Sequence, residues 1–508
     1  PRLQILQWLS LRKKGVKLTL PPQDEEVIES LLNFKGIQPL DIPSALKAEL
    51  RNYQKEGYYW LSFLYKHRFG ACLADDMGLG KTLQTIALLG AIKEGIVKSC
   101  NNQKVHLVVV PSSLVFNWEE EIKRFYPHLK VLSYTGPNRK LDIKGIDVVL
   151  TTYSLMRNDI EKLRKIHFCV VVFDEAQAIK NIHAATTKAA RKLRGDFILS
   201  LTGTPVENHI GEYFSIIDVC LPGLMGDYDE FMKNFKKDDK QWLDEVIKRT
   251  APFVLRRSKE ETIKELPPKI ETNIYLELTE AQKIVYNKLV RELRREIDHA
   301  YATMTKTRAQ VVALSALLKL RRLCLCPKLL EDNMPEDSPK LDILVDRLKM
   351  LKEENHNALV FSQFTSYLDI VEERLKKEGF NILRLDGSTP QAKRRSIVKS
   401  FQEDNGHKVF LLSLKAGGQG LNLTKADYVF HLDPWWNPAV EQQATDRTHR
   451  IGQQNVVTVI RLLMRYTIEE KMLELKKRKQ ALYDALLSTK TTSRGVGLTK
   501  EDLDFLLG

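Results

Sequence analysis

Short runs of aliphatic and β-branched residues alternate with polar and amphipathic stretches from about residue 50 onward. Up to about residue 211, four of these runs have the length and composition of strands that are buried on both faces. They are HLVVV (106–110), DVVL (147–150), CVVVFDE (169–175) and FILSLTG (197–203). Each run is followed by polar or helical sequence, as in strand–helix–strand units, so the pattern predicts a parallel α/β sheet.

The pattern changes after residue 211 and later returns. The middle of the chain is helical and irregular, and residues 279–302 have the spacing of a long, charged amphipathic helix. An acidic linker with two prolines, EDNMPEDSPK (331–340), follows this helix. Beyond the linker, five further runs are predicted to be strands: ALVFSQ (358–363), ILRLDG (382–387), KVFLLSL (408–414), YVFHLD (428–433) and VVTVIRLL (456–463). We therefore expect two similar α/β lobes that flank a helical middle.

The same pattern defines the expected domains. They are an N-terminal helical accessory segment (1–49), a first α/β lobe with a helical insertion from about residue 212 (50–268), a helical insertion with its linker (269–337), a second α/β lobe (338–490) and a C-terminal tail (491–508). A chain of 508 residues is too long for one hydrophobic core, which agrees with several domains. The chain begins with Pro rather than Met, which suggests a fragment of a longer protein.

The charge balance of the chain is basic. The formal net charge is +14 and the pI is about 9.2. Such an excess fits a polyanionic partner, although it can also serve solubility alone. The basic run at 476–479 is more typical of a solvated helix face than of a binding site.

Targeting and cysteine patterns narrow the class further. No apolar run reaches the roughly 18 residues that span a bilayer, and the N-terminus lacks the order of a signal peptide. We therefore expect a soluble, intracellular protein. The six cysteines form no disulfide framework, and Cys324 and Cys326 lack a second pair for zinc, so we interpret both as core thiols or as thiols without a role.

The stretch DDMGLGKT (75–82) resembles a phosphate-binding loop. It follows a short apolar run, ACLA, and precedes LQTIALLGAI, which has helical spacing. Glycines let backbone N–H groups turn toward phosphate oxygens, Lys81 supplies a mobile charge, and Thr82 a hydroxyl for Mg²⁺. The match is incomplete because Asp75 holds the place of the first glycine, and a glycine-rich turn at the start of an ordinary helix is the alternative.

Carboxylates follow the third strand predicted in the first lobe. Asp174 is placed to hold Mg²⁺ beside a phosphate cradle, and Glu175 to orient and deprotonate the attacking water. The alternative, an acidic helix cap after a strand, is weakened by the presence of GKT upstream. The next strand leads into LTGTPVEN (201–208), where Thr202, Gly203 and Thr204 are suited to sensing the γ-phosphate.

Two arginines, Arg447 and Arg450, lie in QQATDRTHRIGQ (442–453) near the end of the second lobe. Their spacing of three places them on one face of a helix, from which both could reach a phosphate chain as arginine fingers. Arginines at this spacing are more often surface charges, so the assignment depends on the other motifs.

Taken together, the motifs resemble the ordered motif series of the Swi/Snf family of ATPases, within helicase superfamily 2. The stretches that carry the resemblance are LRNYQKEGYYWL, DDMGLGKT, VVPSSLVFNWEEEIKRF, DEAQAIKN, LTGTPVEN, FVLRRSKEETIKELPPK, VFSQF, LDGST and SLKAGGQGLNLTKADYVFHLDPWWNPAVEQQATDRTHRIGQ. They span about residues 45 to 490. The resemblance implies an α/β fold with two RecA-like lobes, ATP and Mg²⁺ as cofactors, and double-stranded DNA as the partner.

The resemblance also implies roles for individual residues. The catalytic positions are Lys81, Asp174, Glu175, Arg447 and Arg450. Nucleotide binding falls to Gln54, which reads adenine, and to Asp75, Met77, Gly78, Leu79, Gly80, Lys81 and Thr82, while Thr82 and Asp174 hold the metal. DNA contacts are implied for Pro111, Ser112, Ser113, Thr152, Tyr153, Ser362, Gln363, Gly387, Ser388, Trp435 and Trp436. The two tryptophans have packing as an alternative role.

Two departures from the family pattern are visible. Asp75 in place of the glycine is usual in this family, whereas Gln177 stands where most eukaryotic members have His. Gln177 leaves hydrolysis intact but puts the coupling to LTGTPVEN in question, and it favours a bacterial member. We expect a cytoplasmic, nucleoid-associated protein if the source is bacterial, and a nuclear one if it is eukaryotic.

The favoured function is a DNA-dependent ATPase that translocates on duplex DNA and remodels protein–DNA complexes without strand separation. One alternative is an RNA-directed superfamily 2 helicase, against which WWNPAVEQQATDRTHRIGQ argues. The other alternative is a catalytically inactive DNA clamp. The intact set of five catalytic residues argues against the clamp.

Overall fold

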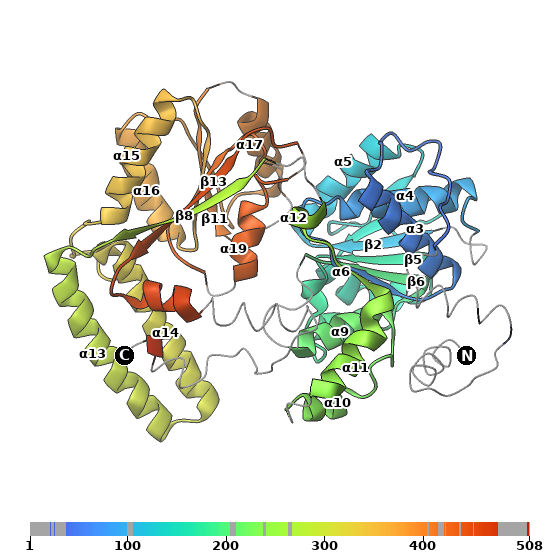
Figure 1. The fold of residues 1–508 in the computed structure, drawn as a ribbon, viewed down its shortest axis with the longest axis horizontal. Coiled ribbons are helices and arrows are strands. Elements are labelled where there is room, and N and C mark those ends of the chain that lie inside the picture. Colours follow the sequence, from blue (N-terminus) through green and yellow to red (C-terminus); the bar gives the residue numbers. More distant parts are fainter. Residues whose placement is uncertain are drawn as a thin grey trace. The chain divides into compact units, whose positions relative to one another are not determined.

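The computed structural model describes most of the chain as two compact units (Figure 1). The described residues are 21, 25, 37–98, 105–203, 210–236, 240–262, 267–403, 406–414, 421, 423–435, 438–450, 452–475 and 505–506. In this range unit 1 ends at Thr262, and unit 2 begins at Pro267. Within the described residues, every helix is too short or too polar to cross a lipid bilayer.

Unit 1 is built on a seven-stranded sheet with the order β3-β4-β2-β5-β6-β1-β7. All neighbouring strands are parallel. The strands are β1 (Ala71–Leu73), β2 (His106–Val110), β3 (Val131–Ser133), β4 (Val148–Thr152), β5 (His167–Asp174), β6 (Arg194–Leu201) and β7 (Val254–Leu255). The four longest strands, β2, β4, β5 and β6, are the four strands predicted from the apolar runs, because runs buried on both faces have no polar alternation.

Helices cover both faces of this sheet (Figure 1). On one face lie α3 (Asn52–Lys66), α4 (Lys81–Glu94) and α5 (Val115–Phe125). On the other lie α6 (Tyr153–Asn158), α8 (Ala185–Ala190) and α9 (Ile210–Cys220), with α7 (Ile160–Leu163) following α6. The unit continues through α10 (Tyr228–Lys236), α11 (Lys240–Thr250) and α12 (Lys259–Thr262). Right-handed crossovers between parallel strands produce this two-sided covering.

Unit 2 contains a six-stranded parallel sheet with the order β10-β11-β9-β12-β13-β8. Its strands are β8 (Lys269–Leu276), β9 (Ala358–Ser362), β10 (Ile382–Leu385), β11 (Val409–Ser413), β12 (Tyr428–His431) and β13 (Val457–Met464). Five of them match the predicted strands. With the first sheet, they confirm the prediction of two parallel α/β lobes with helical insertions.

Two apolar clusters lie on opposite faces of this second sheet. One combines alternate strand residues, such as Val360, with α15 (Pro339–Glu353) and α16 (Thr365–Lys377). The other combines the residues between them, such as Leu359, with α17 (Gln391–Glu403) and α19 (Pro438–Thr445). Alternation along each strand therefore sends side chains to two separate cores.

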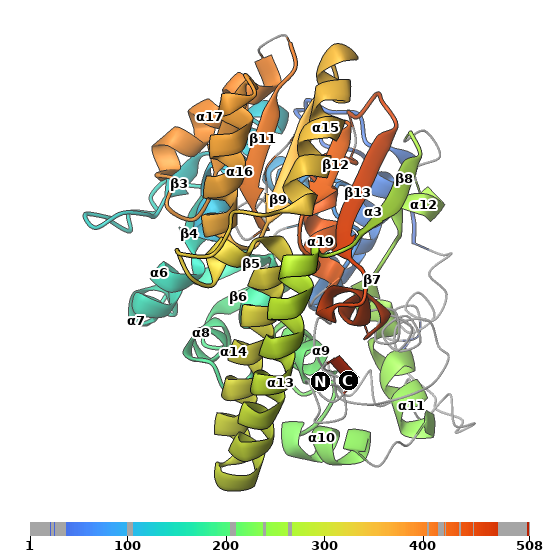
Figure 2. The same cartoon turned by 90° about the vertical axis from the view of Figure 1, so that its left-hand side faces the viewer.

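In the sequence, a helical hairpin lies between β8 and the other strands of unit 2. It consists of α13 (Glu280–Thr303) and α14 (Lys306–Leu325), which lie side by side (Figure 2). The hydroxyl of Thr279 caps α13 by accepting a hydrogen bond from the N–H of Gln282, and Oε1 of Gln282 accepts one from the N–H of Thr279. The apolar core of the hairpin also includes side chains from residues 468–475, so the helical middle packs against the segment that follows β13.

Candidate nucleotide-hydrolysis site

The loop between β1 and α4 has the backbone geometry of a phosphate cradle. Gly78 and Gly80 have φ of 86° and 76°, in the left-handed region that favours glycine. A Cβ on Gly80 would lie 2.5 Å from Nε2 of Gln54, so a side chain there would also force the Gln54 amide to shift. Helix α4 begins at Lys81, and its first-turn N–H groups have no partners within the helix. The end of this loop is thus suited to bind an anion.

Lys81 and Thr82 occupy the first turn of α4. The Lys81 ammonium donates hydrogen bonds to the carbonyl oxygens of Asp75, at 2.6 Å, and Asp76, at 3.2 Å. The cation is therefore held over the loop that would carry the phosphates. Thr82 follows it and is half-buried.

Helix α3 supports the loop from behind. Gln54 is buried, donates to the carbonyl of Leu79 at 3.2 Å, and accepts from the N–H of Arg51 at 3.0 Å. The hydroxyl of Tyr53 donates to the same Leu79 carbonyl at 3.1 Å. The amide predicted to read adenine is thus placed against the glycine-rich loop. Met77 lies close to Gly203, because a Cβ on Gly203 would be 3.0 Å from Cγ of Met77.

Asp75, which stands where a P-loop glycine is usual, has a partner that sequence reasoning missed. Its carboxylate is fully buried and forms a two-pronged pair with Arg257, with Nε–Oδ1 and Nη2–Oδ2 distances of 3.0 and 2.5 Å. Arg257 also donates to the carbonyl of Tyr53 and to Oε1 of Gln84. One arginine after β7 therefore fixes the start of the loop, α3 and α4 together.

The carboxylate pair lies at the end of β5, on the same edge of the sheet. The Asp174 carboxylate accepts from the Trp118 indole N–H at 2.8 Å and from the N–H of Glu175 at 2.9 Å. Burial and the neighbouring Glu175 carboxylate raise the pKa of Asp174 to about 7. Glu175 itself has φ of 50°, an uncommon conformation for a residue with a Cβ.

Two side-chain hydrogen bonds connect Glu175 to the end of β6. Gln177 donates to Oε2 of Glu175 at 2.8 Å and accepts from the hydroxyl of Thr202 at 3.2 Å. Gln177, which stands where most eukaryotic members of the family have His, thus connects Glu175 to the start of the TGT segment at Thr202. Thr204, the other threonine of LTGTPVEN, lies outside the described residues.

These residues fit a magnesium-bound nucleoside triphosphate. Mg²⁺ usually binds one or two carboxylates together with substrate phosphates. Among the described residues, no cluster of three or more His, Cys, Asp or Glu side chains could hold a metal ion alone. A buried carboxylate with a raised pKa gains from a nearby cation, so Asp174 would hold the metal, together with Thr82, to which the family resemblance gives this role.

The DNA-contact positions predicted in unit 1 differ in their surroundings. Ser112 is exposed, and Ser113 has a buried Oγ that finds no hydrogen-bond partner in the described structure. Thr152 caps α6 by accepting from the N–H of Leu155, and Tyr153 donates its hydroxyl to the carbonyl of Asp174 at 2.7 Å. Pro111 precedes the short 3₁₀ turn that carries both serines.

The positions predicted in unit 2 also fall into two kinds. Gly387 and Ser388 are exposed in the turn after β10, whereas Ser362 is buried and donates to Asp433. Gln363 directly follows β9 and is half-buried. Trp435 packs partly against an apolar cluster, in keeping with its alternative role, and Trp436 lies outside the described residues.

The predicted helical placement of Arg447 and Arg450 is wrong. Helix α19 ends at Thr445, and both arginines lie in the turn that follows. The hydroxyl of Thr448 donates a hydrogen bond to the carbonyl of Thr445, and the carbonyl of Arg447 accepts one from the N–H of Leu423. Side-chain and long-range bonds thus replace the next helical turn. Cys324 and Cys326 are buried, as predicted, and the run at 476–479 lies outside the described residues.

A glycine-rich loop with its Lys and Thr at the start of a helix, next to a carboxylate pair on a parallel sheet, defines a P-loop nucleoside-triphosphate hydrolase. The SNF2-related domain matches residues 53–329, and the helicase conserved C-terminal domain matches residues 339–452. The chain belongs to the SNF2 family and is accordingly an ATP-dependent enzyme of the helicase type.

The chain also matches individual proteins and a solved structure. The chain is 36% identical to the ATP-dependent helicase/translocase YwqA of Bacillus subtilis over 94% of its length, and 38% identical to the human SWI/SNF-related regulator of chromatin, subfamily A member 1, over 85%. It spans 53% and 43% of these two proteins, about half the length of the relatives it matches. A solved structure, the Sulfolobus solfataricus SWI2/SNF2 ATPase core in complex with double-stranded DNA, is 35% identical, covering 92% of this chain and 99% of that one at a TM-score of 0.46.

Proposed function

We propose that this protein is a DNA-dependent ATPase that moves along double-stranded DNA and remodels protein–DNA complexes without separating the strands. In hydrolysis, Lys81 holds the phosphates in place and Glu175 takes the proton of the attacking water. A Mg²⁺ held by Thr82 and Asp174 would offset the phosphate charge. The family resemblance assigns Arg447 and Arg450 of unit 2 to the same reaction.

The observation that carries the nucleic-acid part is a pair of enclosed polar atoms at predicted contact positions. Oγ of Ser113 in unit 1 and Nε2 of Gln363 in unit 2 are both buried, and in the described structure neither forms a hydrogen bond. A buried donor without an acceptor costs about 1–3 kcal/mol. Because both atoms are enclosed, phosphate oxygens of a nucleic acid would supply the missing acceptors once binding exposes the two positions.

Charge and relatives support a duplex as the partner. A net charge of +14 favours a polyanion whose backbone is held without base reading. The names of two relatives give one as a helicase/translocase and the other as a regulator of chromatin. From these names we infer DNA-bound proteins as targets and a DNA-associated location in the cell.

One assay tests this function. ATP turnover is measured with duplex DNA, single-stranded DNA and RNA side by side, and we expect the largest increase with duplex DNA. Binding to the duplex should be insensitive to sequence and should fall steeply with salt. Stronger stimulation by RNA would favour the RNA-helicase alternative, and DNA binding without any ATP turnover would favour the inactive clamp.

A further inference from the structure

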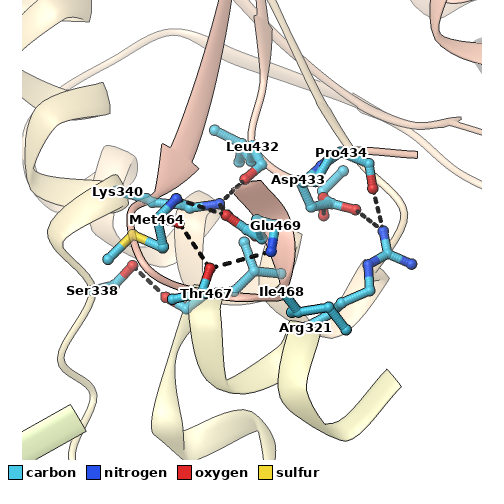
Figure 3. Close-up of polar contacts among 12 residues, drawn as sticks. Arg321, Ser338, Lys340, Leu432, Asp433, Pro434, Met464, Thr467, Ile468 and Glu469 are labelled. Atoms are coloured by element: carbon cyan, nitrogen blue, oxygen red, sulfur yellow. Dashed lines mark hydrogen bonds and ion pairs between the residues drawn. The ribbon is translucent and has the colours of Figure 1, made fainter. Parts of the chain in front are cut away.

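Two buried ion pairs lie at one end of the sheet of unit 2 (Figure 3). Lys340 pairs with Glu469 at 2.7 Å, and Arg321 with Asp433 at 3.5 Å, all four side chains having 0% exposure. Buried charges of this kind need several hydrogen bonds to offset desolvation. The two pairs satisfy that need with different groups, and the difference points to different roles.

The hydrogen bonds of the Lys340–Glu469 pair go to each other and to backbone groups. The ammonium donates to both Glu469 oxygens and to the carbonyl of Leu432, and the Glu469 carboxylate also accepts from the N–H of Met464 at 2.9 Å. These contacts join α15 to the ends of β12 and β13. No residue predicted to touch DNA takes part in these contacts.

The Arg321 pair instead reaches the predicted DNA-contact positions. Arg321 comes from α14 and, besides pairing with Asp433, donates to the carbonyl of Pro434, next to Trp435. The Asp433 carboxylate accepts from the hydroxyl of Ser362 at 2.6 Å and from the N–H of Gln363 at 3.2 Å.

The contact with the Gln363 side chain sets the direction of its amide. Nη1 of Arg321 donates to Oε1 of Gln363 at 3.1 Å. The oxygen end of the amide is therefore engaged, and the NH₂ end is left without an acceptor in the described structure. Arginine can do this because its planar fork serves Asp433 and Gln363 at once, whereas a lysine ammonium has no second arm.

We propose that Arg321 is a positioning residue for DNA binding: it fixes the direction of the amide of Gln363, a predicted DNA-contact residue, and with it the geometry of this strand end. Helix α14 of the helical hairpin thereby sets the geometry of the strand ends after β9 and β12. This inference depends on the proposed function only for the identity of the acceptor.

The test compares Arg321→Met with the matched variant Lys340→Met in the full chain. Each removes the cation of a fully buried pair, so both should lower the melting temperature. Hydrogen exchange without DNA separates them, because the N–H of Gln363 bonds to Asp433 and the N–H of Met464 bonds to Glu469. We expect Arg321→Met to speed exchange at Gln363 about tenfold or more, and Lys340→Met to do so at Met464.

Duplex binding gives the second measurement. Arg321→Lys keeps the charge beside Asp433 but loses the arm to Gln363, so we expect duplex affinity to fall about tenfold with an unchanged salt slope, because the Gln363 amide carries no charge. Lys340→Met should change affinity less than about twofold. Combined with Gln363→Leu, Arg321→Lys should cause little further loss, because both changes remove one contact.

Unchanged exchange at Gln363 in Arg321→Met would overturn the positioning role. Faster exchange with unaltered affinity, or equal affinity losses in the Lys340 and Arg321 variants, would overturn the link to DNA. If the parent protein itself failed to bind duplex DNA, the proposed function would fail, and exchange at Gln363 would still decide whether Arg321 positions this strand end.

Discussion

Glu175 combines a strained backbone with a defined side-chain direction. Its φ of 50° costs about 1–3 kcal/mol in a residue other than glycine, and such strain persists where the surroundings fix it. Here Gln177 holds one carboxylate oxygen, and Gln177 is held in turn by Thr202. The carboxylate is therefore oriented before any substrate arrives, as expected of a base that must meet one particular water.

We predict that Glu175→Gln retains ATP binding and lowers turnover by at least about a hundredfold, because a general base contributes a factor of this size. Steady-state turnover and equilibrium nucleotide binding measure the two effects. Glu161→Gln, a change at an exposed carboxylate of the same unit, serves as the control and should leave both unaltered. Turnover at the parental rate in Glu175→Gln would show that another group activates the water.

His106 should make unit 1 sensitive to acid. It is buried at the start of β2, and desolvation lowers its pKa to about 4 despite the nearby Asp147, with Lys93 acting in the same direction as burial. The unfolded chain, with a pKa near 6.5, binds the proton first, so stability is present above about pH 6.5 and is lost as the pH falls toward 4.

We predict that His106→Leu flattens this part of the stability profile. The difference between parent and variant should reach roughly 3 kcal/mol between pH 7 and pH 4, from 1.36 kcal/mol for each pKa unit. Denaturant unfolding across this range measures it. Parallel profiles for the two proteins would mean that His106 is charged or solvated in the folded state.

At the scale of elements, nine of the strands could be predicted from the sequence, because continuous β-branched runs have few other solutions. The four other strands of the described structure lack that signal. β1 and β3 have three residues each and β7 has two. β8 is an edge strand in which polar residues alternate irregularly with exposed apolar ones such as Ile270 and Tyr275. Its pattern does not stand out from the helical sequence around it.

The site shows a similar division. The glycine-rich loop and the carboxylate pair could be predicted because each is contiguous in sequence. The partners that fix them are distant: Arg257 lies 182 residues from Asp75, and Trp118 lies 56 residues from Asp174. Such pairings depend on strand order, which local patterns do not encode. The turn at Arg447 was missed because long-range bonds override helical spacing there.

The connection from β7 to the phosphate-binding loop should be essential for the stability of unit 1. Arg257→Met leaves the Asp75 carboxylate buried without its partner, which costs about 3–5 kcal/mol. We therefore predict a melting temperature lower by roughly 6–20 °C for a unit of this size. Thermal unfolding followed by circular dichroism measures the change.

The double variant Arg257→Met with Asp75→Asn provides the control, since it removes the unpaired charge as well. It should recover part of the lost melting temperature. A double variant no more stable than Arg257→Met would show that the loss comes from packing of the arginine on Tyr53, over whose ring it lies at 5.3 Å, and not from the buried charge.

At the scale of the whole molecule, the proposed function predicts movement without strand separation. We expect ATP-dependent displacement of the third strand from a DNA triplex and no separation of a forked duplex. A protein that holds phosphates and does not read bases can advance along an intact duplex. Gel analysis of the two substrates, with Glu175→Gln as the inactive control, measures this, and efficient fork unwinding would contradict the translocase assignment.

The pairing of β8 with β13 has a consequence for biosynthesis. The two strands are in register over their full length, yet about 180 residues (457 minus 276) separate them in the chain. At about 5–20 residues per second, β8 leaves the ribosome on the order of ten to forty seconds before its partner is made. During that time the nascent chain carries an unpaired strand edge, which makes unit 2 a client for chaperones that shield such edges until translation passes β13.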